Sequence, residues 1–299
     1  MPAAPGGSWP AIAAARAATA ARLPFSIAHG GRARPAGSVA RAHLGALARW
    51  PDALRVDDAG VLLRCAAHER TGFLAEANRA LHADGLIRGW RDEIFGLPAL
   101  DDGTALATIE RAAARFWGSL TLGAHCNGHL ADASGRPTHL WLARRADTKP
   151  TDPGLLDNLV GGGVPHGQSP AACVQREGWE EAGLTPAQMA GLRPGRRLRL
   201  ARDVHEGFQR EDISVYDLAL PAGLQPQNQD GEVQAIMLLP VAEALDRAAA
   251  GEMTVDASLA TLDFALRHSL LPAPEAALLA AQCEHLWLGA SALDQPPHV

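Results

Sequence analysis

The hydrophobic positions in the first 118 residues are spaced mainly as in helices. Three stretches have apolar residues three and four positions apart, and each ends at or near a proline or glycine: 39–50, 72–83 and 109–117. Proline and glycine commonly end helices, so this spacing predicts three amphipathic helices. Residues 86–97 alternate between apolar and polar side chains, which predicts strands. We therefore expect a small α+β domain over residues 1–118.

From residue 119 onward the pattern predicts strands around one helix, followed by further helices. Strands are predicted over 119–131, 138–144, 197–204, 213–220 and 233–239, and closing helices over 241–250, 257–268 and 275–288. This order predicts a mixed sheet sandwiched between helices. We assign residues 119–270 to this second domain and residues 271–299 to a C-terminal helical extension.

Composition and charge narrow the class of protein. The chain has 299 residues, 47% hydrophobic and 20% charged, which is typical of a folded protein with two domains. Its net charge of −6 is scattered along the chain, so nucleic acid is not an expected partner. The sequence has no apolar stretch long enough to predict a membrane-spanning helix. Its four cysteines are far apart and lack metal-binding spacing, which favours a reducing, cytoplasmic location.

The beginning of the chain admits two interpretations. Residues 1–51 contain six arginines and no acidic residue, a composition that also occurs in organellar transit peptides. Residues 23–27 and 39–50, however, already show the apolar pattern of folded structure. We therefore favour an alanine-rich start of a folded cytoplasmic protein.

Residues 162–184 predict a glycine-rich loop followed by a closely packed helix. Ser169 can cap the helix, Pro170 suits its first position, and Gly183 suits a left-handed C-terminal cap. Small side chains recur about one turn apart, which would let the helix lie close to a sheet. These small residues are Ala171, Val174, Gly178 and Ala182.

Three carboxylates stand on one face of this predicted helix. Glu177, Glu180 and Glu181 are spaced i, i+3 and i+4, and each like-charged pair costs roughly 0.2–0.5 kcal/mol. A solvated acidic face is the simpler explanation. The adjacent glycine loop, the helix cap and Arg176 instead favour a site for Mg²⁺ or Mn²⁺, which prefer carboxylate oxygens and also bind substrate phosphates.

At this point the segment resembles the Nudix box, G-x5-E-x7-R-E-U-x-E-E-x-G-U, in which U is a bulky aliphatic residue. Gln168 stands at the first Glu position of the box and Gly178 at its first aliphatic position. The matching residues are Gly162, Arg176, Glu177, Glu180, Glu181, Gly183 and Leu184. The resemblance implies a Nudix α/β/α fold and a Mg²⁺-dependent enzyme that hydrolyses organic diphosphates.

A narrower resemblance covers most of the chain. Five segments are similar to Nudix proteins of fungi and plants that are associated with thiamine metabolism and carry an additional N-terminal domain: 86–93, 121–128, 157–163, 228–233 and 263–268. In some fungi this module is fused to thiamine pyrophosphokinase. The resemblance implies removal of phosphate from thiamine diphosphate or its oxidised derivatives. Two alternatives are a hydrolase of nucleoside-diphosphate-linked metabolites and a Nudix protein that senses a diphosphate without cleaving it.

The resemblance and the residue types together suggest roles at the reacting end of the substrate. Glu177, Glu180 and Glu181 are expected to hold the metal ion, with the Gly162 carbonyl as a further ligand. One of these glutamates is expected to activate water. Arg176 is expected to position a carboxylate. Glu232 is a further candidate metal ligand or base, although a simple carboxylate at a strand edge is an alternative. Gln168 is expected to weaken metal binding without abolishing activity.

Candidate substrate-binding residues are less tightly defined. Trp90 and Arg91 could stack on and bind a charged ring, Gln209 and Glu211 could contact its polar groups, and His166 could contact phosphate. A buried Trp90 and a solvated His166 are the simpler alternatives. Buried structural roles are favoured for His125, Asn127 and Asn158. The carboxylate helix would hold only the phosphate end, so residues of the first 118 are expected to form one wall of the pocket. The expected partner is a small organic diphosphate, with a homodimer as a possible assembly.

Overall fold

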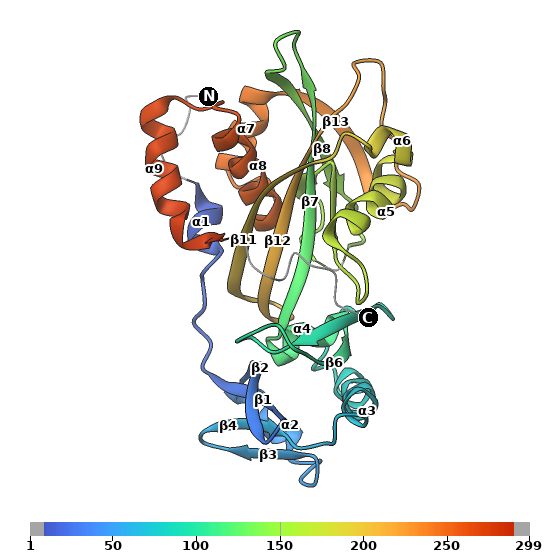
Figure 1. Ribbon diagram of the computed structural model, residues 1–299, viewed down its shortest axis with the longest axis vertical. Coiled ribbons are helices and arrows are strands. Elements are labelled where there is room, and N and C mark those ends of the chain that lie inside the picture. Colours follow the sequence, from blue (N-terminus) through green and yellow to red (C-terminus); the bar gives the residue numbers. More distant parts are fainter. Residues whose placement is uncertain (1–8, 150, 290–299) are drawn as a thin grey trace.

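The computed structural model describes residues 9–149 and 151–289, which form a small N-terminal domain and a larger layered domain (Figure 1). The sheet of the small domain has the strand order β2-β1-β4-β3. Its strands are β1 (Arg22–His29), β2 (Arg32–Ala40), β3 (Leu54–Asp57) and β4 (Gly60–Leu63). The chain continues through α3 (Arg70–Ala83), the hairpin of β5 (Ile94–Pro98) and β6 (Ala105–Glu110), and α4 (Arg111–Trp117).

Two of the helices predicted for this domain are confirmed as α3 and α4, but the helix predicted over residues 39–50 is wrong. Strand β2 continues to residue 40, where Val39 pairs with Leu23 of β1. The helical part is limited to η1 (Arg41–His43) and α2 (Leu44–Leu47). Because pairing with β1 leaves Val39 0% exposed, tertiary packing outweighs the local helical spacing.

The strands predicted over residues 86–97 are confirmed only in β5. Gly89 and Asp92 have φ angles of 71° and 58°, in the left-handed region that interrupts a strand. Arg91 therefore lies in a loop, and its N–H donates to Glu110 Oε1 at 3.1 Å. The same carboxylate oxygen accepts from Ala112 N–H at 3.2 Å, which fixes the loop beside the start of α4.

The larger domain is a mixed sheet between helical layers, as predicted. The strand order is β13-β8-β7-β12-β11-β14, with β10 beside β7 and β9 beside β8. Strands β7 and β12 run parallel, whereas β7 and β8 run antiparallel. The strands are β7 (Leu120–Ala131), β8 (Pro137–Arg145), β9 (Leu156–Asn158), β10 (Val160–Gly163), β11 (Arg193–Val204), β12 (Gly207–Ala219), β13 (Val233–Pro240) and β14 (Trp287–Leu288).

Helices cover both faces of this sheet (Figure 1). One layer contains α5 (Pro170–Ala182) and α6 (Pro186–Met189), and the other contains α1 (Pro10–Ala14), α7 (Val241–Ala249), α8 (Val255–Arg267) and α9 (Ala273–Cys283). The helix predicted over 275–288 ends earlier, and η2 (Glu284–Leu286) and β14 follow it. Helix α1 packs on α8, where Trp9 Nε1 donates to Ser258 Oγ at 2.7 Å. The division of the chain at residues 118 and 270 stays a prediction.

Candidate active site

Helix α5 and strand β10 form the floor of the candidate site. Ser169 Oγ caps the helix by accepting from Ala172 N–H at 3.2 Å, and Gly183 ends it with a φ of 65°. A Cβ atom at Gly162 would lie 2.5 Å from Glu177 Oε1. Only glycine therefore allows the Glu177 carboxylate to lie so close to this strand.

The three carboxylates of α5 have different environments. Glu181 is 7% exposed, and its Oε2 accepts from Gly161 N–H at 2.9 Å. Arg176 donates to Glu177 Oε1 at 2.8 Å and to Glu180 Oε2 at 2.6 Å. Glu177 and Glu181 line a pocket, whereas the Glu180 side chain is 37% exposed and turned toward Arg176. Glu177 and Glu181 are thus the two helix carboxylates that a ligand in the pocket would meet.

Both pocket carboxylates are buried without full charge compensation, and this raises the pKa of each. Burial and the neighbouring charge of Glu177 raise the pKa of Glu181 to about 8. Burial also raises the pKa of Glu177, although Arg176 opposes this. Within residues 9–149 and 151–289, no three His, Cys, Asp or Glu side chains converge around a single point. The adjacent, undercompensated oxygens nevertheless fit a hard divalent cation, which would stabilise the ionised form of both groups.

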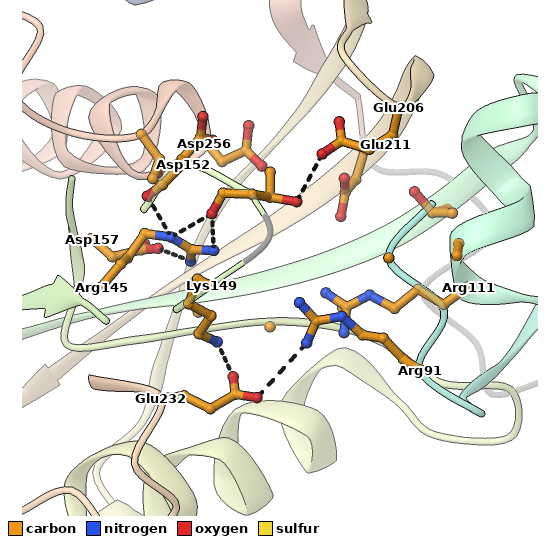
Figure 2. A pocket seen from close by; sticks show the side chains of 18 of the residues that line it. Arg91, Arg111, Arg145, Lys149, Asp152, Asp157, Glu206, Glu211, Glu232 and Asp256 are labelled. Carbon is orange, nitrogen blue, oxygen red and sulfur yellow. Dashed lines mark hydrogen bonds and ion pairs between the residues drawn. The ribbon is translucent and has the colours of Figure 1, made fainter. Parts of the chain in front are cut away.

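The pocket lies between the two domains and is lined by charged side chains (Figure 2). The first 118 residues contribute one wall, as predicted, through the loop at Arg91, through Phe95 and through α4. A Cβ at Gly163 would lie 2.6 Å from Phe95 Cζ, so the domains are in direct contact there. Six cationic side chains line the pocket: Arg88, Arg91, Arg111, Arg115, Arg145 and Lys149.

Near the α5 carboxylates, Glu232 is paired with two of these cations. Lys149 Nζ forms an ion pair with Glu232 Oε2, and Arg91 Nη1 lies 3.7 Å from Glu232 Oε1. Arg145 is held separately, because it donates to Asp157 Oδ2 at 2.9 Å and to the Thr151 carbonyl at 2.8 Å. These contacts place the predicted base or metal ligand Glu232 in the pocket, but bound to cations.

Acidic side chains gather at another part of the pocket, and the buried Gln209 beside them does not line it (Figure 2). Gln209 Nε2 donates to Glu211 Oε2 at 2.9 Å and to Asp256 Oδ2 at 3.0 Å, and Arg115 Nη2 lies 3.2 Å from Glu211 Oε2. Burial and the charge of Asp256 raise the pKa of Asp152. In the described part of the chain, Asp256 Oδ1 and Arg115 Nη1 are buried without a hydrogen-bond partner. Such atoms are usually satisfied by a ligand or by water.

The structure places two other predicted substrate contacts away from this pocket. Trp90 stacks on His82 with ring centroids 5.0 Å apart, and its Nε1 donates to Asp92 Oδ1 at 2.8 Å. It lines a neighbouring hollow that it shares with Arg91, Lys149 and Glu232. The His166 side chain is exposed on the loop before α5. The substrate roles of Trp90 and His166 stay predictions.

Three polar residues with expected structural roles form one buried network. Asn158 Oδ1 contacts His125 Nδ1 at 2.9 Å, and Asn158 Nδ2 donates to Asn127 Oδ1 at 3.0 Å. His125 also lies 3.6 Å from Asp157, the partner of Arg145. The network therefore supports the wall that carries Arg145.

Gln168, in the loop before α5, has a buried Oε1 without a hydrogen-bond partner among the described residues.

Sequence reasoning missed several pocket residues. Arg111 and Arg115 are four positions apart on α4, so their spacing could have indicated a shared face. Lys149 is the only lysine among the 27 basic residues, an isolated choice that could have marked it for attention. Asp256 gave no sequence signal, because the fold alone brings the first turn of α8 beside β12.

The class of domain is defined by an α/β/α sandwich in which one helix, α5, carries carboxylates and packs on a glycine-rich strand of the sheet. Residues 129–257 match the family model described as the NUDIX domain, and residues 14–120 match a domain of unknown function, DUF4743. The chain therefore carries a Nudix domain, and the residues before it are similar to DUF4743.

Curated relatives agree with this assignment. Over 205 residues the chain is 34% identical to "Nudix hydrolase 20, chloroplastic" of Arabidopsis thaliana, covering 68% of this chain and 54% of that protein. It is 35% identical to "Nudix hydrolase 24, chloroplastic" of the same plant over 68% of this chain and 55% of that protein. The chain thus spans about half the length of these relatives. The protein in the crystal structure of DR0079 from Deinococcus radiodurans is 24% identical to this chain, with a TM-score of 0.43, covering 57% of this chain and 98% of the DR0079 chain.

No helix in the described ranges is long and apolar enough to cross a membrane.

Proposed function

We propose that this chain is a divalent-metal-dependent hydrolase that cleaves the diphosphate bond of a small organic diphosphate. The observation that carries the proposal is the pocket in which Glu177 and Glu181 of the Nudix helix lie beside a glycine strand and several cations. Carboxylates suit Mg²⁺ or Mn²⁺, and Arg and Lys suit phosphate oxygens. One pocket therefore offers both kinds of group that diphosphate cleavage needs.

The residues divide the work of hydrolysis. Glu177 and Glu181, with the Gly162 carbonyl, would hold the cation, and Arg176 keeps the Glu177 carboxylate in place. When bound, the cation supplies charge neutralisation at the phosphate and lowers the pKa of a bound water. A glutamate, either on α5 or Glu232, would accept the proton of the attacking water. The bond to the bridging oxygen then breaks, releasing phosphate and a monophosphate.

We further propose thiamine diphosphate or an oxidised derivative as the substrate. The proposal is supported by the resemblance of the chain to thiamine-associated Nudix proteins. It is also supported by the acidic end of the pocket, where Glu211 and the unpartnered Asp256 Oδ1 would accept from a ring that carries a positive charge or an amino group. Gln209 would position these two carboxylates, since its Nε2 donates a hydrogen bond to each of them.

We propose a cytoplasmic location for the protein.

A substrate panel tests this proposal. The purified full chain is incubated with Mg²⁺ and thiamine diphosphate, its oxidised analogues, ADP-ribose or NADH, and phosphate and monophosphate products are quantified. We expect the highest kcat/KM with a thiamine-type diphosphate. Preferential cleavage of ADP-ribose or NADH would reject the thiamine assignment and retain the hydrolase. Tight binding of a diphosphate without turnover would favour the sensing alternative.

A further inference from the structure

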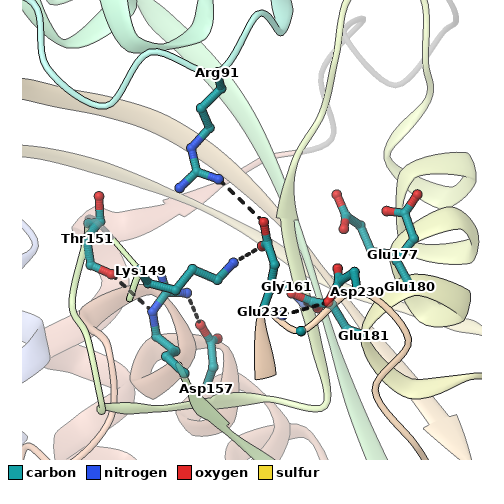
Figure 3. Close-up of polar contacts among 12 residues, drawn as sticks. Arg91, Lys149, Thr151, Asp157, Gly161, Glu177, Glu180, Glu181, Asp230 and Glu232 are labelled. Atoms are coloured by element: carbon teal, nitrogen blue, oxygen red, sulfur yellow. Dashed lines mark hydrogen bonds and ion pairs between the residues drawn. The ribbon is translucent and has the colours of Figure 1, made fainter. Parts of the chain in front are cut away.

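The Glu232 carboxylate lies between two cationic side chains that come from different parts of the chain (Figure 3). Lys149 follows β8, whereas Arg91 belongs to the loop of the N-terminal domain before β5. Both contact the carboxylate, Lys149 by an ion pair and Arg91 at 3.7 Å, which is too long for a hydrogen bond. The Lys149 side chain is only 11% exposed. The Glu232 side chain is 43% exposed, so the structure holds an anionic group between a shielded lysine and an arginine at a site that stays open to solvent.

The backbone around this site is fixed independently of the ion pairs. Glu232 N–H donates to Asp230 Oδ1 at 2.8 Å, and the Glu232 carbonyl accepts from Ala146 N–H at 3.0 Å. Lys149 N–H donates to the Ala146 carbonyl at 3.1 Å. The Glu232 side chain can therefore rotate away without any rearrangement of the turn that carries it.

One carboxylate contacts the two cations of this site. Burial lowers the pKa of Lys149, the charge of Glu181 opposes this, and Arg145, which lowers it further, is already occupied by Asp157. Burial and the charge of Arg111 also lower the pKa of Arg91. A phosphoryl group carries more charge than a carboxylate and has three oxygens to accept from both cations. It would therefore compensate this site better than Glu232 does.

The position of Arg91 and Lys149 in the pocket also suits the binding of a phosphoryl group. Arg91 and Lys149 line the same pocket as Glu177 and Glu181, and the charge of Lys149 is felt at Glu181. An anion held by the two cations would thus lie next to the candidate metal-binding carboxylates. Lysine is a common point-charge ligand for phosphate, and arginine adds directional N–H donors.

We propose that Arg91 and Lys149 form a phosphoryl-binding subsite, and that the Glu232 carboxylate occupies this subsite until a diphosphate displaces it. This inference rests on the proposed function for its ligand class. Before substrate binds, the Glu232 carboxylate thus competes with the phosphoryl group for Arg91 and Lys149, in addition to any role that it has after displacement. Displacement would also leave the Glu232 carboxylate unpaired at the moment when the phosphate enters.

Calorimetric titration with imidodiphosphate tests the subsite without turnover. This probe has a nitrogen in place of the bridging oxygen, and the titration is made in EDTA at low salt. We expect Lys149→Met and Arg91→Met each to weaken binding by about tenfold or more, and Lys149→Arg to retain most of it. Arg247→Met, which removes an arginine paired on the surface of α7, is the matched control and should bind like wild type.

The distinguishing variant is Glu232→Gln. Because it removes the competing charge, it should tighten imidodiphosphate binding by about threefold to tenfold, whereas Glu243→Gln on α7 should not. Unchanged or weaker binding by Glu232→Gln would overturn the proposal, as would unchanged binding by both cation variants. If Lys149→Met does not fold, as judged by circular dichroism, Arg91→Gln and Glu232→Gln decide the question.

The outcome is separable from that of the proposed function. If no diphosphate is hydrolysed but the binding pattern holds, the hydrolase is wrong and the subsite stands. If diphosphates are hydrolysed and the variants bind imidodiphosphate like wild type, the subsite is wrong and the hydrolase stands.

Discussion

Replacing Glu181 by glutamine should stabilise the metal-free protein at alkaline pH. The pKa of Glu181 is raised from 4.5 to about 8, so the folded protein holds a proton that the unfolded chain has lost. Stability from this group is complete below pH 4.5 and is lost progressively as the pH rises to about 8. Each pKa unit corresponds to roughly 1.4 kcal/mol, so the loss is on the order of a few kcal/mol. Glutamine stays neutral and can still accept from Gly161 N–H, so it avoids this loss.

Urea unfolding of wild type and Glu181→Gln in EDTA, at pH 5 and pH 8, measures the effect. The free energy of unfolding should be similar for the two proteins at pH 5 and higher for the variant at pH 8. Glu243→Gln, at a side chain that is 45% exposed, is the control and should show no such pH dependence. Addition of Mg²⁺ at pH 8 should stabilise wild type more than the variant. Equal pH dependence in wild type and Glu181→Gln would refute the assigned burial and charge coupling of Glu181.

Three other substitutions test the site in turnover assays. Gly162→Ala should lower kcat by about tenfold or more, because its Cβ would displace Glu177, whereas Gly96→Ala, with its nearest contact at 3.6 Å, should have little effect. Gln168→Glu should leave activity unchanged or raise it, most at limiting Mg²⁺, and a severe loss would show that the loop has another role. Trp90→Ala should change KM equally for a thiamine-type and a ring-free diphosphate, because Trp90 stacks on His82 outside the pocket. A rise of about 1–3 kcal/mol of binding for the thiamine-type substrate alone would instead show that Trp90 stacks on the ring.

The larger domain could be predicted well because its local signals agree with its tertiary contacts. Ser169, Pro170 and Gly183 mark the ends of α5, and the structure has the helix at residues 170–182. The small domain was harder to predict from the sequence. Val39 lies in a stretch with helical spacing, yet it pairs with β1 across a hairpin. Gly30 and Gly31 carry the turn of that hairpin with φ angles of 58° and 74°, a signal that sequence reasoning could have used.

Residue spacing predicts the candidate site only where its residues are close in sequence, whereas Arg91, Glu211 and Glu232 were named from residue type and family resemblance. Glu177 and Glu181 share a helix face, so their spacing alone indicates that they act together. Arg91, Lys149 and Glu232 come from three separate segments, and only the fold brings them to one point. A single sequence without homologues contains no signal that links such segments.

The most direct test of the account follows diphosphate cleavage by ³¹P nuclear magnetic resonance. Wild type and the double variant Glu177→Gln, Glu181→Gln are compared on thiamine diphosphate and its oxidised analogues, with Mg²⁺ and with EDTA. The account predicts signals of phosphate and monophosphate only for wild type with Mg²⁺, while circular dichroism shows both proteins folded. Equal cleavage by the double variant, or cleavage by wild type in EDTA, would contradict it.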